Sequence, residues 1–179
     1  QYTKKDFELG LIRNHYVGRT FIEPTQHIRS LGVKLKLSST KTMLKNKKVI
    51  LIDDSLVRGT TCLKIIKMLY EGGAKEVHVR IACPEIMFPD FYGVDMPTKS
   101  ELLASNKNTA EMCEYIGAKS LKFLTLEGLY NALIGTKRNH NYPQFSDHYF
   151  TGDYPIKPLD RLQGLKIKQL SLLSGKSNN

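Results

Sequence analysis

Two adjacent carboxylates at the end of an apolar run are the residues of this sequence best suited to chemistry. Asp53 and Asp54 directly follow the four apolar residues 49–52. Four apolar residues in a row are typical of a strand buried on both faces of a parallel sheet, and ligands of such sheets bind at the carboxyl ends of the strands. Carboxylate oxygens suit ribose hydroxyls or a hydrated magnesium ion. The pattern therefore predicts a polar ligand site at Asp53 and Asp54.

The residues that follow have the composition of an anion-binding loop. Gly59 permits a tight backbone path, and Thr60 and Thr61 are placed to cap the next helix with their hydroxyls. The N-terminus of a helix attracts phosphate. Carboxylates and phosphate donors in one small pocket predict a site for a phosphorylated sugar. Spacing alone leaves a second interpretation open, in which the Asp-Asp-Ser sequence is an ordinary turn at the end of a strand.

The neighbouring sequence predicts the elements that would hold this site. A helix should follow Gly59 and end at Gly72-Gly73, a common helix-ending signal. Its apolar residues have helical spacing; they are Cys62, Ile65, Ile66 and Leu69. Alternating apolar residues predict a strand over residues 76–82, and a further strand is expected over residues 121–126.

Helix signals also occur around the last of these strands. Residues 98–101 have a capping pattern, and Gly117 is expected to end a helix that contains Met112 and Ile116. Another helix is predicted over residues 129–134. Strands that alternate with helices are typical of α/β proteins, so we expect a doubly wound parallel sheet.

The string from Val49 to Thr61 resembles the phosphoribosyl pyrophosphate signature of type I phosphoribosyltransferases. Further segments resemble the glutamine phosphoribosylpyrophosphate amidotransferase family, and the similarity runs from about Leu11 to Tyr154. These segments are residues 11–24, 32–37, 77–82 and 91–95. The resemblance implies a type I phosphoribosyltransferase-like α/β fold with a parallel sheet flanked by helices. It also implies that ammonia displaces pyrophosphate from phosphoribosyl pyrophosphate to form phosphoribosylamine in de novo purine synthesis.

Residue roles follow from the resemblance by position. Asp53 and Asp54 would be catalytic and would serve magnesium and the ribose hydroxyls. The residues implied to hold the 5-phosphate are Ser55, Arg58, Gly59, Thr60 and Thr61. The stretch 13–24 would be a lid that closes over the sugar, with Tyr16, Arg19 and Thr20 as its working residues. Composition alone would equally fit an ordinary basic surface loop there.

Family members also have parts that the resemblance does not include. These are an amino-terminal glutaminase domain, and a strand followed by a loop that helps to hold pyrophosphate. We therefore expect a partial phosphoribosyltransferase domain over residues 1–154, lacking its first strand, and a tail over residues 155–179 that forms a docking helix or contacts another subunit. Activity stays open, because a separate polypeptide could supply the missing half. The alternative is a non-catalytic remnant or regulatory module that binds phosphoribosyl pyrophosphate or purine nucleotides.

The resemblance also bears on cofactors and assembly. It implies Mg²⁺ and a homo-oligomer. Some family members hold an iron–sulfur cluster through cysteines near the Phe-Tyr-Gly and Phe-Thr-Gly segments, but residues 88–91 and 142–150 contain no cysteine here, so we expect no cluster. His140 and His148 lack the partners and spacing of metal ligands and are expected to be solvent-facing or hydrogen-bonded.

Composition agrees with one domain of ordinary size. The chain has 179 residues, of which 41% are hydrophobic and 25% charged. No apolar run approaches the roughly 20 residues that span a membrane, so we expect a cytoplasmic protein without a membrane partner. Cys62, Cys83 and Cys113 are few and widely spaced, which favours reduced thiols.

The formal net charge of +10 raises the question of nucleic-acid binding. Lys34 and Lys36 alternate with apolar residues, as on a strand with one face in solvent. A polyphosphate substrate near the expected lid already explains positive potential there. No interleaved aromatic residues or nucleic-acid motif accompany these lysines, so we expect no nucleic-acid partner.

Overall fold

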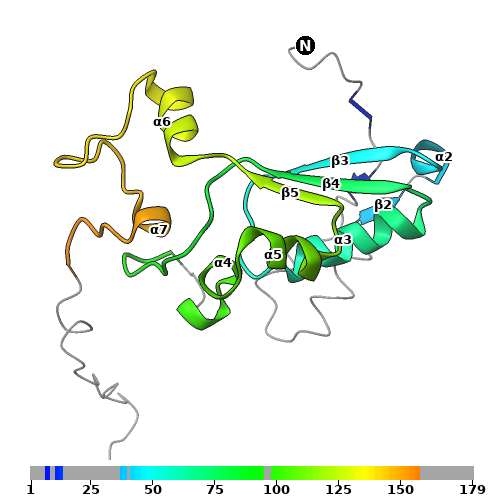
Figure 1. Ribbon diagram of the computed structural model, residues 1–179, viewed down its shortest axis with the longest axis horizontal. Coiled ribbons are helices and arrows are strands. Elements are labelled where there is room, and N and C mark those ends of the chain that lie inside the picture. Colours follow the sequence, from blue (N-terminus) through cyan, green and yellow to red (C-terminus); the bar gives the residue numbers. More distant parts are fainter. Residues whose placement is uncertain (1–6, 9–10, 14–36, 40, 95–97, 158–179) are drawn as a thin grey trace, which may run out of the picture.

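The structure is a computed structural model that describes residues 7–8, 11–13, 37–39, 41–94 and 98–157. Its elements follow one another in the order of the α/β pattern (Figure 1). They are β1 (Leu11–Arg13), β2 (Leu37–Ser39), α2 (Lys41–Leu44), β3 (Lys48–Asp53), α3 (Thr60–Glu71), β4 (Glu76–Ile81), the 3-10 helix η2 (Lys99–Glu101), α4 (Leu103–Asn106), α5 (Thr109–Ile116), β5 (Ser120–Phe123), α6 (Leu126–Ile134) and α7 (His148–Thr151).

A parallel sheet of strand order β3-β4-β5 forms the centre of the described part. Its register places Asp53 beside Ile81, and Ile81 beside Phe123, so the three strands end at one edge. Strands β1 and β2 form a separate antiparallel pair. The predicted α/β class and the parallel sheet flanked by helices are therefore confirmed.

The core lies between one face of this sheet and helices α3 and α5. Strand β4 alternates as predicted, with Val77, Val79 and Ile81 buried. They share the core with residues of both helices, which include Cys62, Ile66, Leu69, Met112 and Ile116. Figure 1 shows α3, α4 and α5 together on one side of the sheet.

The other face of β3 differs from the prediction. We expected a strand buried on both faces, but Ile50 is 53% exposed and Ile52 is 72% exposed. Val49 and Leu51, which point the other way, pack against the core. In the described residues the sheet is thus covered on one face at β3, and the doubly wound arrangement is not seen there.

The predicted helices are present, with some shifted ends. Helix α3 runs to Glu71 and ends at Gly72, and α5 ends at Gly117 with a positive φ of 74°, both as expected. The strand predicted over residues 121–126 ends earlier, at Phe123. The reason is local, because Thr125 accepts a hydrogen bond from the Gly128 N–H at 3.0 Å and starts α6 three residues before the prediction.

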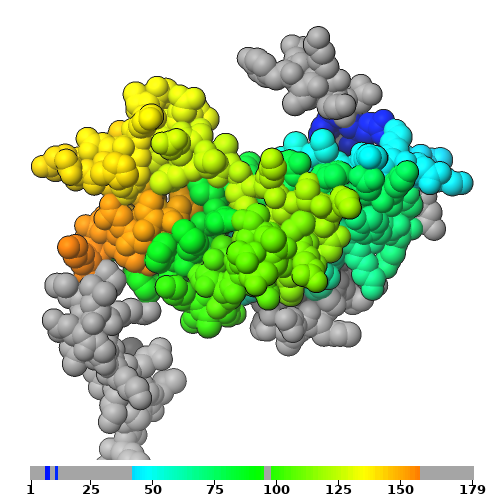
Figure 2. Space-filling view, in the orientation of Figure 1, coloured from blue at the N-terminus to red at the C-terminus, as the bar shows by residue number. Residues whose placement is uncertain are grey.

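Residues 126–157 extend beyond the sheet as a lobe made of α6, α7 and the chain between them (Figure 2). The lobe is tied to the loop after β4, since the Tyr149 carbonyl accepts from the backbone N–H groups of Met87 and Phe88 at 2.9 and 3.0 Å. The predicted docking helix of the tail, with its leucines at 159, 162, 165 and 170, lies outside the described residues.

Candidate functional site

The carboxyl end of β3 presents two carboxylates side by side. Asp53 is the last residue of the strand and is half-buried, whereas Asp54 is exposed. The Asp54 N–H donates to Asp53 Oδ1 at 3.0 Å, and the Ser55 hydroxyl donates to Asp54 Oδ1 at 2.8 Å. These short local bonds fix the turn and hold both acids at the end of the sheet.

The environment of Asp53 disfavours its negative charge. Burial raises the pKa of the Asp53 carboxyl, the hydrogen bond from the Asp54 N–H opposes that rise, and the neighbouring Asp54 carboxylate adds to it. A cation bound between the two acids would relieve the repulsion. Oxygen donors of this kind are those that Mg²⁺ prefers, so the donor set fits the predicted metal. The described residues contain no group of three or more His, Cys, Asp or Glu side chains that could hold a metal ion.

The turn into α3 depends on Gly59. It has a positive φ of 76° and is the residue before the helix, as the predicted tight backbone path requires. A side chain at this position would also collide with its neighbours, since an added Cβ would lie 2.8 Å from Leu103 Cδ2 and 3.0 Å from Tyr115 Cε1. Glycine is therefore needed for both its conformation and its small size.

The predicted capping of α3 by threonine hydroxyls is wrong. Gly59 is the N-cap, and no side chain caps the helix, because Thr60 and Thr61 are already its first two residues. A glycine N-cap has no side-chain oxygen to offer to the first N–H groups. The amino end of α3 therefore directs uncapped N–H groups toward the loop that carries the two acids, which is a favourable setting for an anion.

Two further contacts fix the outer side of the loop. The Leu103 N–H donates to the Val57 carbonyl at 2.9 Å. Arg58 forms an ion pair with Glu101, with 3.1 Å between Nε and Oε1, and both side chains are well exposed. Glu101 also accepts from the Thr98 N–H at 3.2 Å, so the capping pattern predicted at residues 98–101 is present, although it opens a 3-10 helix.

The thiols of Cys62 and Cys83 lie near the two acids, which the sequence did not predict. Burial and, to a smaller extent, the charge of Asp53 raise the pKa of the Cys62 thiol to about 12. Burial and, to a smaller extent, the charge of Asp54 raise the pKa of the Cys83 thiol to about 11. Both thiols are therefore protonated near neutral pH. Cys62, Cys83 and Cys113 are all unpaired, as predicted.

The structure brings the predicted residues of one loop together but does not cover the whole predicted site. Asp53, Asp54 and Ser55 are joined by hydrogen bonds, and the segment from Arg58 to Thr61 leads from them into α3. Tyr16, Arg19 and Thr20 lie outside the described residues, as do Lys34 and Lys36.

Comparison with known proteins decides the family. The chain is 57% identical over 169 residues to amidophosphoribosyltransferase of Rhizobium etli, a match that covers 94% of this chain. It is 50% identical over 149 residues to the enzyme of the same name from Staphylococcus aureus. The chain belongs to the amidophosphoribosyltransferase family. It spans about a third of the length of these relatives, 34% and 30% respectively, and matches their C-terminal part.

Solved structures of the amidophosphoribosyltransferase family have the same fold. Glutamine phosphoribosylpyrophosphate amidotransferase from B. subtilis, complexed with ADP and GMP, superposes with a TM-score of 0.70 at 47% identity. That match covers 84% of this chain and 33% of the other. A structure described as the allosteric regulatory enzyme of purine biosynthesis gives a TM-score of 0.68, also at 47% identity. A scan against protein-family profiles gives no match.

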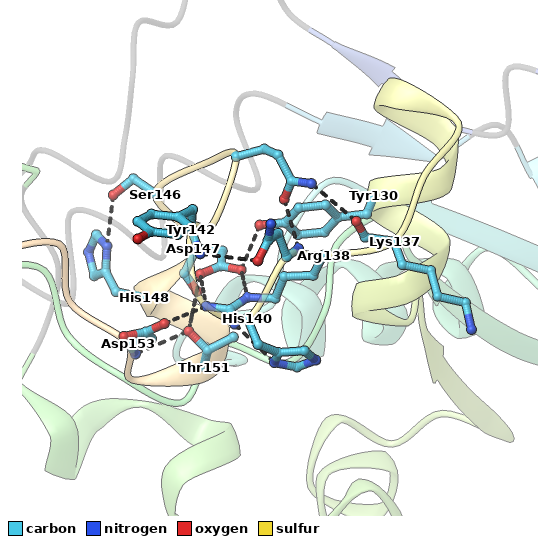
Figure 3. A network of polar contacts seen from close by, with 12 residues as sticks. Tyr130, Lys137, Arg138, His140, Tyr142, Ser146, Asp147, His148, Thr151 and Asp153 are labelled. Carbon is cyan, nitrogen blue, oxygen red and sulfur yellow. Dashed lines mark hydrogen bonds and ion pairs between the residues drawn. The ribbon is translucent and has the colours of Figure 1, made fainter.

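A second polar cluster of the chain lies in the lobe formed by residues 126–157 (Figure 3). Arg138 binds both oxygens of Asp147, at 2.6 and 3.1 Å, and also Asp153 at 2.7 Å. The Tyr130 hydroxyl donates to Asp147 at 2.8 Å. Asp147 is only 4% exposed, and the bonds it accepts from Arg138 and Tyr130 outweigh the effect of burial and lower its pKa.

Asp90 and His148 join this lobe to the loop after β4. His148 Nε2 lies 2.9 Å from Asp90 Oδ1, and the Tyr149 hydroxyl donates to the same oxygen at 3.1 Å. Burial alone would raise the pKa of Asp90, but the N–H groups of Val94 and Tyr92, with His148 and Tyr149, hold it at about 2. His148 is thus hydrogen-bonded, as predicted.

A pocket of about 550 Å³ lies at the carboxyl end of β5. Its lining is mostly apolar and includes Pro84, Met87, Leu121, Phe123 and Phe150. Lys122 and Glu85 add charge to its wall. No helix in the described part of the chain is long and apolar enough to cross a membrane.

Proposed function

We propose that this chain is the transferase portion of an amidophosphoribosyltransferase and binds phosphoribosyl pyrophosphate at the loop of residues 53–61. The observation that carries the proposal is the arrangement of that loop. Two repelling carboxylates at the end of β3 stand beside the uncapped amino end of α3. Carboxylates suit ribose hydroxyls, and helix N–H groups suit phosphate. The names of the relatives support the same substrate.

Each residue of the loop has a role in this proposal. Asp53 and Asp54 hold the ribose hydroxyls and Mg²⁺, which offsets the charge of the diphosphate when it is bound. The N–H groups that follow Gly59, with the hydroxyls of Ser55, Thr60 and Thr61, hold the 5-phosphate. Arg58 would exchange Glu101 for phosphate, which is a small change because exposed ion pairs are weak.

The proposed reaction is a substitution at the anomeric carbon of the sugar. The lone pair of ammonia forms the new C–N bond, the bond from carbon to the pyrophosphate oxygen breaks, and pyrophosphate leaves with that electron pair. The ammonium group that results loses one proton to give phosphoribosylamine. The Asp53 and Asp54 carboxylates orient the ring, and orientation of this kind can supply a large part of the acceleration.

Two further parts complete the proposal. Tyr16, Arg19 and Thr20, in the stretch 13–24, would close over the bound sugar and exclude water from the reacting carbon. A polypeptide equivalent to the rest of the relatives' length would supply the remaining contacts with pyrophosphate. We also propose assembly as a homo-oligomer.

A second candidate function is nucleotide binding without catalysis. The B. subtilis relative was solved with ADP and GMP, and a purine nucleotide presents a ribose and a 5-phosphate like those of the proposed substrate. The same loop could therefore bind a purine nucleotide in a regulatory module that has no transferase activity.

Calorimetric titration separates these functions. The purified chain is titrated with phosphoribosyl pyrophosphate and Mg²⁺, then ammonia is added and released pyrophosphate is measured. Binding followed by release supports the transferase. Binding without release, with competition by GMP, supports the nucleotide-binding module. If neither phosphoribosyl pyrophosphate nor GMP binds, with or without the upstream portion of a relative, the assignment of the loop is wrong.

A further inference from the structure

The Arg58 side chain has more hydrogen-bond donors than its one contact uses. Arg58 lies in the loop of residues 53–61 and pairs with Glu101 through Nε, which is 3.1 Å from Oε1. A guanidinium carries five N–H donors in a planar fork. Among the described residues no partner binds its two terminal nitrogens, and the side chain is 44% exposed. Arg58 is therefore held by one carboxylate oxygen and is accessible to a second anion.

Glu101 keeps its position without help from Arg58. Its Oε2 accepts from the N–H and from the hydroxyl of Thr98, both at 3.2 Å, in the capping box of η2. The Asn106 side-chain amide donates to the Ser100 carbonyl at 2.9 Å and so braces η2 from the end of α4. The Glu101 carboxylate is thus fixed by its own element and stays in place when Arg58 leaves it.

The main chain on both sides of Arg58 is fixed as well. The Leu103 N–H donates to the Val57 carbonyl at 2.9 Å, so α4 is tied to the residue before Arg58. The residue after it, Gly59, is packed so closely that an added Cβ would lie 2.8 Å from Leu103 Cδ2 and 3.0 Å from Tyr115 Cε1. The side chain of Arg58 is therefore the part of this contact that can change its partner.

Two anions can compete for this side chain. Arg58 directly precedes Gly59, the N-cap of α3, so an anion at the amino end of that helix lies close to it. The bond from Arg58 lowers the pKa of Glu101, which is therefore ionised near neutral pH. Exposed ion pairs are weak because water screens them, whereas arginine binds phosphate through two parallel charge-assisted bonds. A phosphate group can therefore displace Glu101, but it does so against a resident competitor.

We propose that Glu101 is an internal competitor for Arg58, which lowers the affinity of the loop for a phosphate group and favours its release. Glu101 acts through Arg58 and is therefore a positioning residue. That the phosphate is the 5-phosphate of a sugar rests on the proposed function. The phosphorylated product keeps this group after pyrophosphate has left, so the same competition favours release of the product.

Two glutamates that differ in this one contact provide the first test. Glu101 and Glu111 each take the third position of a capping box and accept from the N–H of its first residue. Both are exposed, and of the two only Glu101 forms an ion pair with a described residue. Glutamine suits this position of a capping box as well as glutamate does. Glu101→Gln and Glu111→Gln therefore remove equal charge and keep the helix starts.

The two variants should differ in affinity for phosphate. Glu101→Gln should bind about two- to fivefold more tightly than the parent chain, which corresponds to the loss of an exposed ion pair, and Glu111→Gln should change the affinity less than about 1.5-fold. Calorimetric titration measures phosphoribosyl pyrophosphate with Mg²⁺, and amide NMR shifts over residues 59–61 measure the weaker binding of inorganic phosphate. An unchanged or lower affinity of Glu101→Gln would overturn the proposal, and so would an equal gain in both variants.

A second pair of variants isolates the role of Arg58. Arg58→Gln removes the contested cation and should bind phosphate more weakly than the parent chain. Adding Glu101→Gln to Arg58→Gln should then change the affinity less than about 1.5-fold, because there is no longer an ion pair to release. A two- to fivefold gain that persists without Arg58 would overturn the competition, since Glu101 would then act on the ligand directly through its charge.

The two probes also separate this inference from the proposed function. If inorganic phosphate shows the gain that depends on Arg58 but phosphoribosyl pyrophosphate does not bind, the competition is supported and the sugar assignment is contradicted. If phosphoribosyl pyrophosphate binds equally to the parent chain and to Glu101→Gln, the ligand assignment stands and the competition is overturned. If neither probe binds to either chain, both are overturned.

Discussion

Two regions of the molecule both carry aspartate side chains, but their surroundings shift the carboxyl pKa in opposite directions. At the end of β3, Asp53 and Asp54 lie next to each other and form no ion pair with any described residue, and burial raises the pKa of Asp53. In the lobe of residues 126–157, Asp147 is buried against Arg138 and has a lowered pKa. Asp90, which joins that lobe to the loop after β4, has its pKa held at about 2.

This contrast separates the proposed binding site from a structural joint. In the lobe and its joint, hydrogen bonds or an ion pair reach each buried carboxylate, so the charge stabilises the folded chain itself. In the loop of residues 53–61, termed the β3 loop, the two negative charges repel one another, and we propose that a bound ligand or cation stabilises them. Among the described residues, every buried side-chain nitrogen or oxygen has a hydrogen-bond partner.

The largest loss of unfolding free energy should come from breaking the buried ion pair between Arg138 and Asp147. Replacing the guanidinium in Arg138→Leu leaves Asp147 charged and buried, and loss of one partner of such a pair typically costs about 3–5 kcal/mol of unfolding free energy. Urea unfolding measures the change. Arg58→Leu is the control, because its pair with Glu101 is exposed and its loss should leave the unfolding midpoint unchanged. Similar midpoints for the two variants would contradict the distinction between the regions.

A smaller loss of stability should follow from adding a methyl group at the β3 loop. Gly59→Ala combines a left-handed backbone with a collision against Leu103, which together should cost about 2–4 kcal/mol. Gly117→Ala has a similar φ of 74° but open space around its added Cβ, so it should cost only the backbone part, about 1–2 kcal/mol. Equal losses in urea unfolding would show that the close packing at Gly59 does not matter.

The two regions also differ in how much of their structure the sequence predicts. The β3 loop is local in sequence, so a run of thirteen residues predicted its strand, its turn at Gly59 and its helix. The joint between Asp90 and His148 spans 58 residues, and no pattern within either segment predicts the pairing. The two errors at the loop have local causes. Gly59 itself is the N-cap, so the two threonines are already inside α3. The second face of β3 carries Ile50 and Ile52, which no described residue buries.

Neutralising the two acids of the loop should weaken binding without a loss of stability. Asp53→Asn with Asp54→Asn removes the carboxylates proposed to hold Mg²⁺ and ribose, so affinity for phosphoribosyl pyrophosphate should fall at least about tenfold, or about 1.4 kcal/mol. Glu114→Gln with Glu127→Gln is the control, because it removes two exposed acids on α5 and α6 and changes the net charge equally. Calorimetric titration that gives the same affinity for both double variants would refute the assignment of the loop.

The dependence of stability on pH compares the two regions most directly. The pKa of Asp90 in the folded chain is about 2, below the usual value near 3.9, so its stabilisation is present above about pH 4 and is lost as the pH falls toward 2. The pKa of Asp53 is raised, so its ionisation opposes folding and that penalty grows as the pH rises above about 4.

Relative to the parent chain, Asp90→Asn should therefore lose stability at pH 6 and lose less as the pH approaches 2. Asp53→Asn should gain stability at pH 6 and show no gain near pH 2. Urea unfolding across this pH range measures the change in stability of each variant. If both variants lose stability at pH 6, or both gain it, the two carboxylates do not have opposite effects on folding.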